Sequence, residues 1–124
     1  MTAILVADDD VDIRDLVAFK LEQAGFEVTV VDNGVAALES ARANPPDLLV
    51  LDVMMPGMSG IDVCRELRGE RATANLPIIL LTAHAAEGEV ELGFGAGADD
   101  YLVKPFNHRE VVSRVEAVLA RVRT

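Results

Sequence analysis

Five short, mostly apolar runs recur along the 124-residue chain, and amphipathic or polar stretches separate them. Runs of this length are too short for helices and are typical of strands that are buried on both faces of a sheet. Strands that alternate with helices predict a parallel sheet, because parallel strands need a crossover connection, which is usually a helix. We therefore expect an α/β fold of five strand–helix units, with strands at 3–7, 27–31, 48–51, 78–81 and 101–103.

The stretches between these runs predict helices. In the first stretch, apolar residues recur at helical spacing, at Ile13, Leu16, Val17 and Leu21. Further helices are expected at 35–41, 61–67 and 86–95. The last helix should begin after Asn107, which precedes Glu110 by the spacing of a capping box. No linker, repeat or low-complexity segment interrupts the pattern, so residues 1–124 are expected to form one domain.

Composition narrows the class of protein. The only cysteine, Cys64, excludes a disulfide framework and a cysteine-based metal cluster. No apolar stretch approaches the ~20 residues of a membrane span, so we expect a soluble, cytoplasmic protein with no membrane partner. The net charge is −10, and residues 1–62 carry 12 acidic and 3 basic side chains. Such an acidic chain is not expected to bind nucleic acid directly, because nucleic-acid-binding surfaces are basic.

Polar side chains stand where the predicted strands end. An acidic triplet at 8–10 follows the first run, and Asp52, Thr82 and Lys104 end the third, fourth and fifth runs. The carboxyl ends of parallel strands meet at one edge of a sheet, where sites collect in folds of this class. One acid at a strand end is usually a solvated residue. Acids at two strand ends, with a hydroxyl and a lysine at two others, predict a shared site.

Carboxylates that share such an edge repel one another and raise one another's pKa values. A divalent cation removes this repulsion, and oxygen ligands favour Mg²⁺, since the chain offers no histidine or cysteine cluster for zinc. The cation and Lys104 together would also tolerate a phosphoryl group. A nucleotide cradle is disfavoured, because it needs a glycine-rich loop after the first strand, where this chain has three aspartates.

Four segments of this chain together resemble the receiver domain of two-component response regulators. They are Asp8-Asp9, LDVMMPG at 51–57 with Gly60, LTA at 81–83, and GADDYLVKPF at 97–106. The likeness covers essentially the whole chain, and the C-terminal part is most similar to receivers that are linked to winged-helix DNA-binding domains. The resemblance implies a flavodoxin-like, doubly wound (βα)5 fold with strand order 2-1-3-4-5, an order that periodicity alone leaves open.

The resemblance also implies a role for each residue of the shared edge. Asp52 is expected to accept a phosphoryl group from a sensor histidine kinase, a phosphotransfer protein or a small phosphodonor. Asp9, Asp52 and the Met54 backbone carbonyl would bind Mg²⁺, and Asp8 would act mostly through a metal-bound water. Lys104 would pair with Asp52 and then with the phosphoryl group. The protein is not expected to be an enzyme beyond its own phosphorylation and dephosphorylation.

Two further residues are expected to form a switch. By the same resemblance, Thr82 would hydrogen-bond the phosphoryl oxygen, and Tyr101 would swing inward as Thr82 moves. This change would alter the surface of the helix at 86–95, the strand at 101–103 and the last helix. The altered surface would then control an effector or partner.

A phosphorylation-dependent homodimer is a further expectation from the resemblance. Residues of opposite charge would join two copies of the chain, in the pairs Asp100–Arg114 and Asp99–Arg121, with Glu110 in a third pair. The alternative interpretation is that these residues form ordinary surface ion pairs, worth roughly 0–1 kcal/mol each.

Three other functions fit the chain less well. A phosphatase with an aspartate nucleophile, of the dehalogenase type, needs a second acid two residues after Asp52, where this chain has Met54. A flavin-binding module of similar topology needs a phosphate-binding loop. A degenerate receiver would bind a partner without being phosphorylated, and it is the main alternative, although Asp52, Thr82 and Lys104 are all present.

Overall fold

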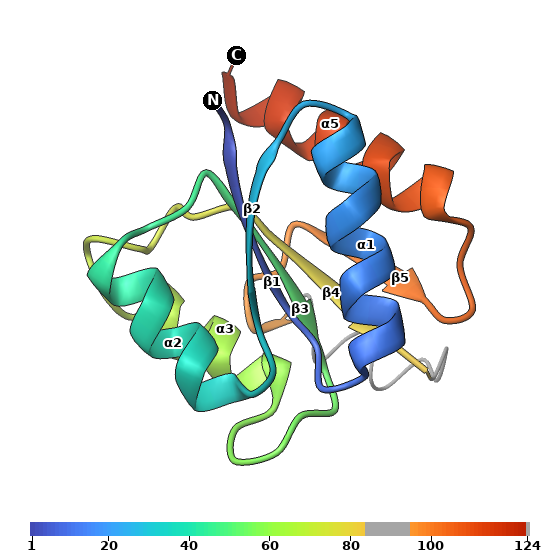
Figure 1. The fold of residues 1–124 in the computed structure, drawn as a ribbon. Coiled ribbons are helices and arrows are strands. Elements are labelled where there is room, and N and C mark those ends of the chain that lie inside the picture. Colours follow the sequence, from blue (N-terminus) through green and yellow to red (C-terminus); the bar gives the residue numbers. More distant parts are fainter. Residues whose placement is uncertain (84–94, 124) are drawn as a thin grey trace.

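The computed structural model describes residues 1–83 and 95–123, which form one parallel sheet with helices on both faces (Figure 1). The strand order is β2-β1-β3-β4-β5, so the doubly wound α/β fold and the order implied by the resemblance are confirmed. Each strand agrees with its predicted run to within one residue at either end. The strands are β1 (Ala3–Ala7), β2 (Glu27–Val31), β3 (Leu48–Asp52), β4 (Ile78–Thr82) and β5 (Asp100–Val103).

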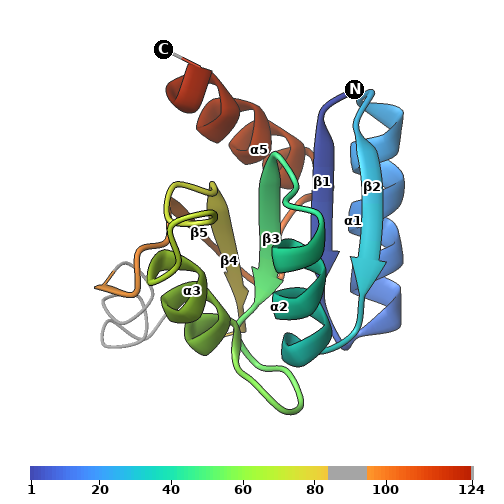
Figure 2. The ribbon, with the colours of Figure 1, turned by 90° about the vertical axis from the view of Figure 1, so that its left-hand side faces the viewer.

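Two of the described helices cover each face of the sheet. α1 (Val11–Gln23) and α5 (His108–Arg123) lie together on one side, and α2 (Gly34–Ala43) and α3 (Gly60–Arg68) lie together on the other (Figure 1, Figure 2). The helix predicted at 86–95 falls almost wholly on residues 84–94, which lie outside the described residues. Among the helices that the structure describes, none is both long and apolar enough to cross a membrane.

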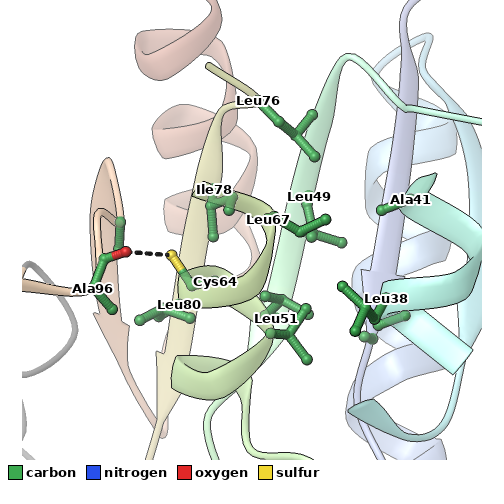
Figure 3. Packing of buried hydrophobic residues seen from close by; sticks show 14 of the residues in the cluster. Leu38, Ala41, Leu49, Leu51, Cys64, Leu67, Leu76, Ile78, Leu80 and Ala96 are labelled. Carbon is green, nitrogen blue, oxygen red and sulfur yellow. Dashed lines mark hydrogen bonds between the residues drawn. The ribbon is translucent and has the colours of Figure 1, made fainter. Parts of the chain in front are cut away.

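The two faces of the sheet carry two buried apolar clusters. Successive side chains of a strand point to opposite faces, so alternate residues enter different clusters. Leu49, Leu51 and Leu80 pack against α2 and α3 (Figure 3), whereas Val50 and Leu81 pack against α1 and α5. β3 and β4 are buried along their whole length. Asp52 and Thr82, the polar residues at the ends of these two strands, are therefore held by buried segments.

Capping side chains begin each described helix beside the carboxyl edge of the sheet. A side-chain oxygen of Asp10 accepts hydrogen bonds from two backbone N–H groups in the first turn of α1, at 3.0 and 3.2 Å. Asn33, Ser59 and Asn107 cap α2, α3 and α5 in a similar way, which confirms the predicted cap at Asn107. These caps satisfy N–H groups that the first helical turn leaves unbonded. The side chain of Asp10 therefore caps α1, and in this role it differs from Asp8 and Asp9, the other two acids of the triplet.

The solvent-facing side of α1 carries several apolar side chains. Val17 and Leu21 fill the cluster beneath the helix. Leu16, which recurs with them at helical spacing, is 50% exposed. Consecutive helical residues point roughly 100° apart, and Leu16 therefore leaves the core when Val17 enters it. Val11 and Phe19 are exposed on this helix as well.

Two glycines fix the loop that follows β3. A Cβ atom on Gly60 would lie 2.4 Å from the carbonyl oxygen of Asp52, and a Cβ atom on Gly34 would lie 2.1 Å from that of Met58. The first turn of α3 therefore packs directly on the end of β3, and the start of α2 packs on the loop between them. The N–H of Gly60 also donates to the Val53 carbonyl at 2.9 Å. Asp52 is held in place by the strand before it and by the helix that follows.

We expect Gly60→Ala to destabilise the fold, because the added methyl group would collide with the Asp52 carbonyl oxygen and force β3 and α3 apart. Overpacking of this kind costs roughly 1–3 kcal/mol, which urea denaturation followed by circular dichroism measures. Gly69→Ala is the matched control, since a Cβ atom there would meet its nearest atoms at 3.6 and 3.7 Å. Equal urea midpoints for the two variants would contradict this account of Gly60.

Candidate functional site

Four of the predicted site residues meet at the carboxyl edge of the sheet. Asp8 follows β1, Asp52 and Thr82 end β3 and β4, and Lys104 follows β5. In Figure 2, β1, β3 and β4 end at the same lower edge. Asp8 and Thr82 are fully buried, Asp52 is 4% exposed, and the Lys104 side chain is largely buried. The structure thus brings these side chains together in a partly enclosed polar site above an apolar sheet.

A lysine bridges two of the carboxylates. Nζ of Lys104 lies 3.2 Å from Oδ2 of Asp8 and 3.3 Å from Oδ2 of Asp52. Sequence reasoning paired Lys104 with Asp52 and missed the contact with Asp8. The backbone N–H of Lys104 donates to the Thr82 carbonyl at 2.6 Å, and the Lys104–Pro105 peptide bond is cis. Lys104 therefore contacts residues from the ends of β1, β3 and β4.

The electrostatics of this cluster favour a further cation. Burial raises the pKa of Asp52 to about 7, and the Asp8 carboxylate adds to the rise, while Lys104 opposes it. Burial by itself lowers the pKa of Lys104, but the Asp52 and Asp8 carboxylates outweigh burial and leave that pKa raised. The lysine is therefore positively charged. When both acids are ionised, one negative charge is left over, and it attracts a cation.

Three carboxylates offer oxygens to such a cation. One oxygen from each of Asp8, Asp9 and Asp52 lies within 4.8 Å of the others. The backbone N–H of Asp10 donates to Oδ1 of Asp8 at 2.9 Å and orients that carboxylate. Asp9 is exposed, so the cluster is open to solvent on one side. An all-oxygen donor set with a solvent-facing side fits Mg²⁺, which keeps several of its waters.

The loop after β3 turns back over Asp52. The backbone N–H of Met54 donates to Oδ1 of Asp52 at 3.4 Å, while Met54 itself is exposed. The Met54 side chain therefore contributes little packing at this edge. Its backbone carbonyl as a metal ligand stays a prediction.

The two switch candidates are both buried. Thr82 is the last residue of β4 and pairs in register with Val103 of β5. Tyr101 is 9% exposed, and its hydroxyl oxygen is buried. Tyr101 already lies inward in this structure. The movement of Tyr101 on phosphorylation stays a prediction. It would require a second state in which the side chain points outward.

Part of the charged set predicted for a dimer lies together on β5 and α5. Nη1 of Arg114 is 3.2 Å from both carboxylate oxygens of Asp100, and Nη2 of Arg114 is 3.9 Å from Glu110. Arg121 is exposed further along α5. These contacts lie within one chain, and pairs between two chains stay a prediction.

Asp99 lies on another side of the sheet from this group. Its carboxylate is 3.0 Å from Nη2 of Arg68, the last residue of α3. Nothing in the sequence marks Arg68 for this contact, because arginine is common in the last turn of a helix. Only the folded chain brings it to Asp99.

An apolar pocket of about 130 Å³ adjoins the site beside α1. Its lining comes from α1 and from the segment after β5: Ile13, Leu16, Val17, Lys104, Pro105 and Phe106. Val11 and Phe19 are two further exposed apolar residues of α1. We call the exposed residues Val11, Leu16 and Phe19, together with the pocket, the α1 surface. A sequence signal existed, since α1 has more apolar positions than one buried stripe needs.

Comparisons with known proteins agree with this geometry. A family model described as the response regulator receiver domain matches residues 4–116. The DNA-binding response regulator MtrA of Mycolicibacterium paratuberculosis is 47% identical over 118 residues, which are 95% of this chain and 51% of that protein. The chain thus spans about half the length of the curated relatives it matches.

Two solved structures show the same fold. The receiver domain of Francisella response regulator 1452 is 36% identical, with a TM-score of 0.91 over 98% of this chain and 99% of that one. The receiver domain of sensor histidine kinase PA1611 from Pseudomonas aeruginosa is 31% identical, with a TM-score of 0.89 over 96% of this chain and 98% of that one. That structure has a magnesium ion coordinated in its active-site cleft. The match along the chain and the shared fold show that this protein belongs to the response regulator receiver domain family.

Proposed function

We propose that this chain is a phospho-accepting signalling switch of the cytoplasm. Asp52 would take a phosphoryl group from a sensor histidine kinase, a phosphotransfer protein or a small donor, in a Mg²⁺-dependent reaction. The observation that carries the proposal is the buried Asp52 carboxylate beside Asp8, with the Lys104 ammonium 3.3 Å away. Membership of the receiver family supports the same role. The chain would act on no substrate other than its own phosphoryl group.

Asp52 would act as the nucleophile. One of its carboxylate oxygens would attack the phosphorus atom of the donor, and the bond between phosphorus and the donor's leaving group would break. The product is an aspartyl phosphate. Lys104 would then pair with the new phosphoryl oxygens, since its ammonium already lies beside the Asp52 carboxylate. Thr82 would donate its hydroxyl hydrogen to another phosphoryl oxygen.

Asp8, Asp9, Asp52 and the Met54 carbonyl are the groups that would hold the cation. When bound, Mg²⁺ would offset the negative charge of the phosphoryl oxygens. Lys104 alone supplies one positive charge against three aspartates, so the uncompensated edge would repel a phosphodonor. The magnesium ion in the PA1611 receiver domain supports this assignment.

Phosphorylation would be transmitted through Thr82 and Tyr101. Because Tyr101 is already buried, phosphorylation would shift an existing equilibrium toward this inward state and would not create a new one. The surface that changes would be formed by β5, α5 and the helix expected at 86–95. A phosphorylation-dependent homodimer through this surface is part of the proposal, with the candidate residues Asp99, Asp100, Glu110, Arg114 and Arg121.

The α1 surface supports a protein as the natural donor. Its pocket is lined in part by Lys104, so a protein that brings a phosphohistidine to Asp52 would come close to it. An apolar pocket with further exposed apolar residues on the same helix is a feature of many protein interaction sites. A small donor such as acetyl phosphate would need no contact with them.

Incubation with acetyl phosphate and Mg²⁺, followed by measurement of the intact mass, tests phosphorylation. We expect the chain to gain one phosphoryl group, and we expect Asp52→Asn or a chelator of Mg²⁺ to abolish the gain. Asp10→Asn is the matched control from the acidic triplet, because asparagine also caps helices and labelling should persist. If the folded chain gains no phosphoryl group from any small donor, the degenerate receiver, an interaction module that works without phosphorylation, is the better function.

Substitution of the α1 surface tests the protein donor. Leu16→Ser and Phe19→Ser should each slow transfer from a phosphorylated histidine phosphotransfer protein by about tenfold, the effect of losing one central apolar contact. Labelling by acetyl phosphate should not change. Val30→Ser, at an exposed valine of the edge strand β2, is the control. Unchanged transfer in both α1 variants would rule this surface out.

A further inference from the structure

The first turn of α2 packs against the backbone of the loop that joins β3 to α3. We call residues 53–59 the β3–α3 loop. Gly34, the first residue of α2, is buried, and a Cβ atom there would lie 2.1 Å from the Met58 carbonyl oxygen and 2.8 Å from its carbonyl carbon. In Figure 2 the loop lies at the lower edge, beside the start of α2. A larger residue at position 34 would therefore push the helix and the loop apart.

The next residue of α2 contacts the same loop at a second point. Gly57 has a φ of +82°, a dihedral that glycine adopts without strain. A Cβ atom on Gly57 would lie 3.4 Å from Cγ2 of Val35, so this methyl group lies beside the loop backbone. Val35 is 43% exposed, and its side chain therefore fills little of the core. Two successive residues of α2 thus support the β3–α3 loop.

A push from α2 would be absorbed within the loop, close to Asp52. The N–H of Gly60 donates to the Val53 carbonyl at 2.9 Å, which holds the two ends of the loop together. α2 is anchored by buried side chains on its inner side, so it is less free to move than the loop. Met54 is weakly held, because it is 64% exposed and its N–H reaches Oδ1 of Asp52 only at 3.4 Å, a long hydrogen bond. A displacement of Met58 would therefore be passed on to Met54.

We propose that Gly34 is a positioning residue for the cation: the first turn of α2 sets the β3–α3 loop, and the loop sets the Met54 carbonyl beside Asp52. This inference rests on the proposed function, because it concerns the Mg²⁺ that phosphorylation of Asp52 would require. Gly34 would act through Met58 and would not contact the cation. Val35 would support the same loop at Gly57. Groups that orient metal ligands from outside the ligand set commonly change metal affinity by a factor of about 10 or more.

Isothermal titration calorimetry of the chain with Mg²⁺, well below the melting temperature, tests this role. Gly34→Ala should weaken Mg²⁺ binding about tenfold, because the displaced loop moves the Met54 carbonyl. Val35→Ala is the second variant. Since Val35 is exposed, the fold should stay intact, and the dissociation constant should rise at least about twofold. In labelling by acetyl phosphate, the Mg²⁺ concentration that gives half the maximal rate should rise in the same way, whereas the rate at saturating Mg²⁺ should stay close to that of the wild type.

Two control variants separate positioning from loss of stability. Thr73 is buried and donates its hydroxyl hydrogen to the Leu67 carbonyl at 2.7 Å, in the segment between α3 and β4. Thr73→Ala should therefore lower the melting temperature and leave the Mg²⁺ affinity unchanged. Gly69→Ala, whose added methyl group would meet its nearest atoms at 3.6 and 3.7 Å, should also leave the affinity unchanged.

A folded Gly34→Ala variant that binds Mg²⁺ as tightly as the wild type would overturn the positioning role. If that variant does not fold, Val35→Ala decides in its place. Equal weakening by Thr73→Ala would also overturn the role, because the affinity would then follow stability. Amide NMR spectra without metal give an independent readout, in which Gly34→Ala and Val35→Ala should both shift the Met54 resonance. A wild-type chain that neither binds Mg²⁺ nor gains a phosphoryl group would refute the proposed function, and the Met54 resonance alone would then decide whether α2 sets the loop.

Discussion

One ammonium group between two buried carboxylates is the interaction on which the rest of this structure depends. Lys104 lies 3.2 Å from Asp8 and 3.3 Å from Asp52, and both acids are almost wholly withdrawn from water. Two buried carboxylates so close together would be strongly unfavourable without a counter-charge. The lysine offsets one of the two charges. The remaining negative charge attracts a cation to this edge of the sheet. Without that cation, the same charge would repel a phosphoryl group.

The fold serves this cluster by holding its members on separate rigid elements. β1, β3 and β4 are apolar and buried until they reach the edge, where a polar residue is presented. Asp10 caps α1 directly after Asp8 and Asp9, and Gly60 allows α3 to start against the end of β3. The site is therefore set by backbone packing, and a small donor or a protein donor would meet a preformed arrangement. Such preformed charge positions are what phosphoryl transfer requires of a protein.

Much of the site could be predicted because its residues follow strands whose periodicity is plain. Asp8, Asp52, Thr82 and Lys104 were expected at one edge, since parallel strands end on the same side. The contacts themselves could not be predicted: Lys104 and Asp8 are 96 residues apart, and Arg68 and Asp99 are 31 apart. Periodicity cannot tell which strands are neighbours, so the strand order came from the family resemblance. The exposure of Leu16 could not be predicted either, because helical spacing does not tell which apolar residues face the core, and the packing around the helix decides that.

The central claim is that burial and Asp8 hold Asp52 partly protonated near neutral pH until a cation binds, and an NMR titration of the Asp52 side-chain carboxyl carbon measures this directly. Without divalent cations, the account predicts a pKa of about 7. Saturating Mg²⁺ should lower that pKa well below 7, because the cation competes with the proton, and Mg²⁺ affinity should therefore rise with pH up to about that value. A titration midpoint near the ordinary value of 3.8, unchanged by Mg²⁺, would contradict the account.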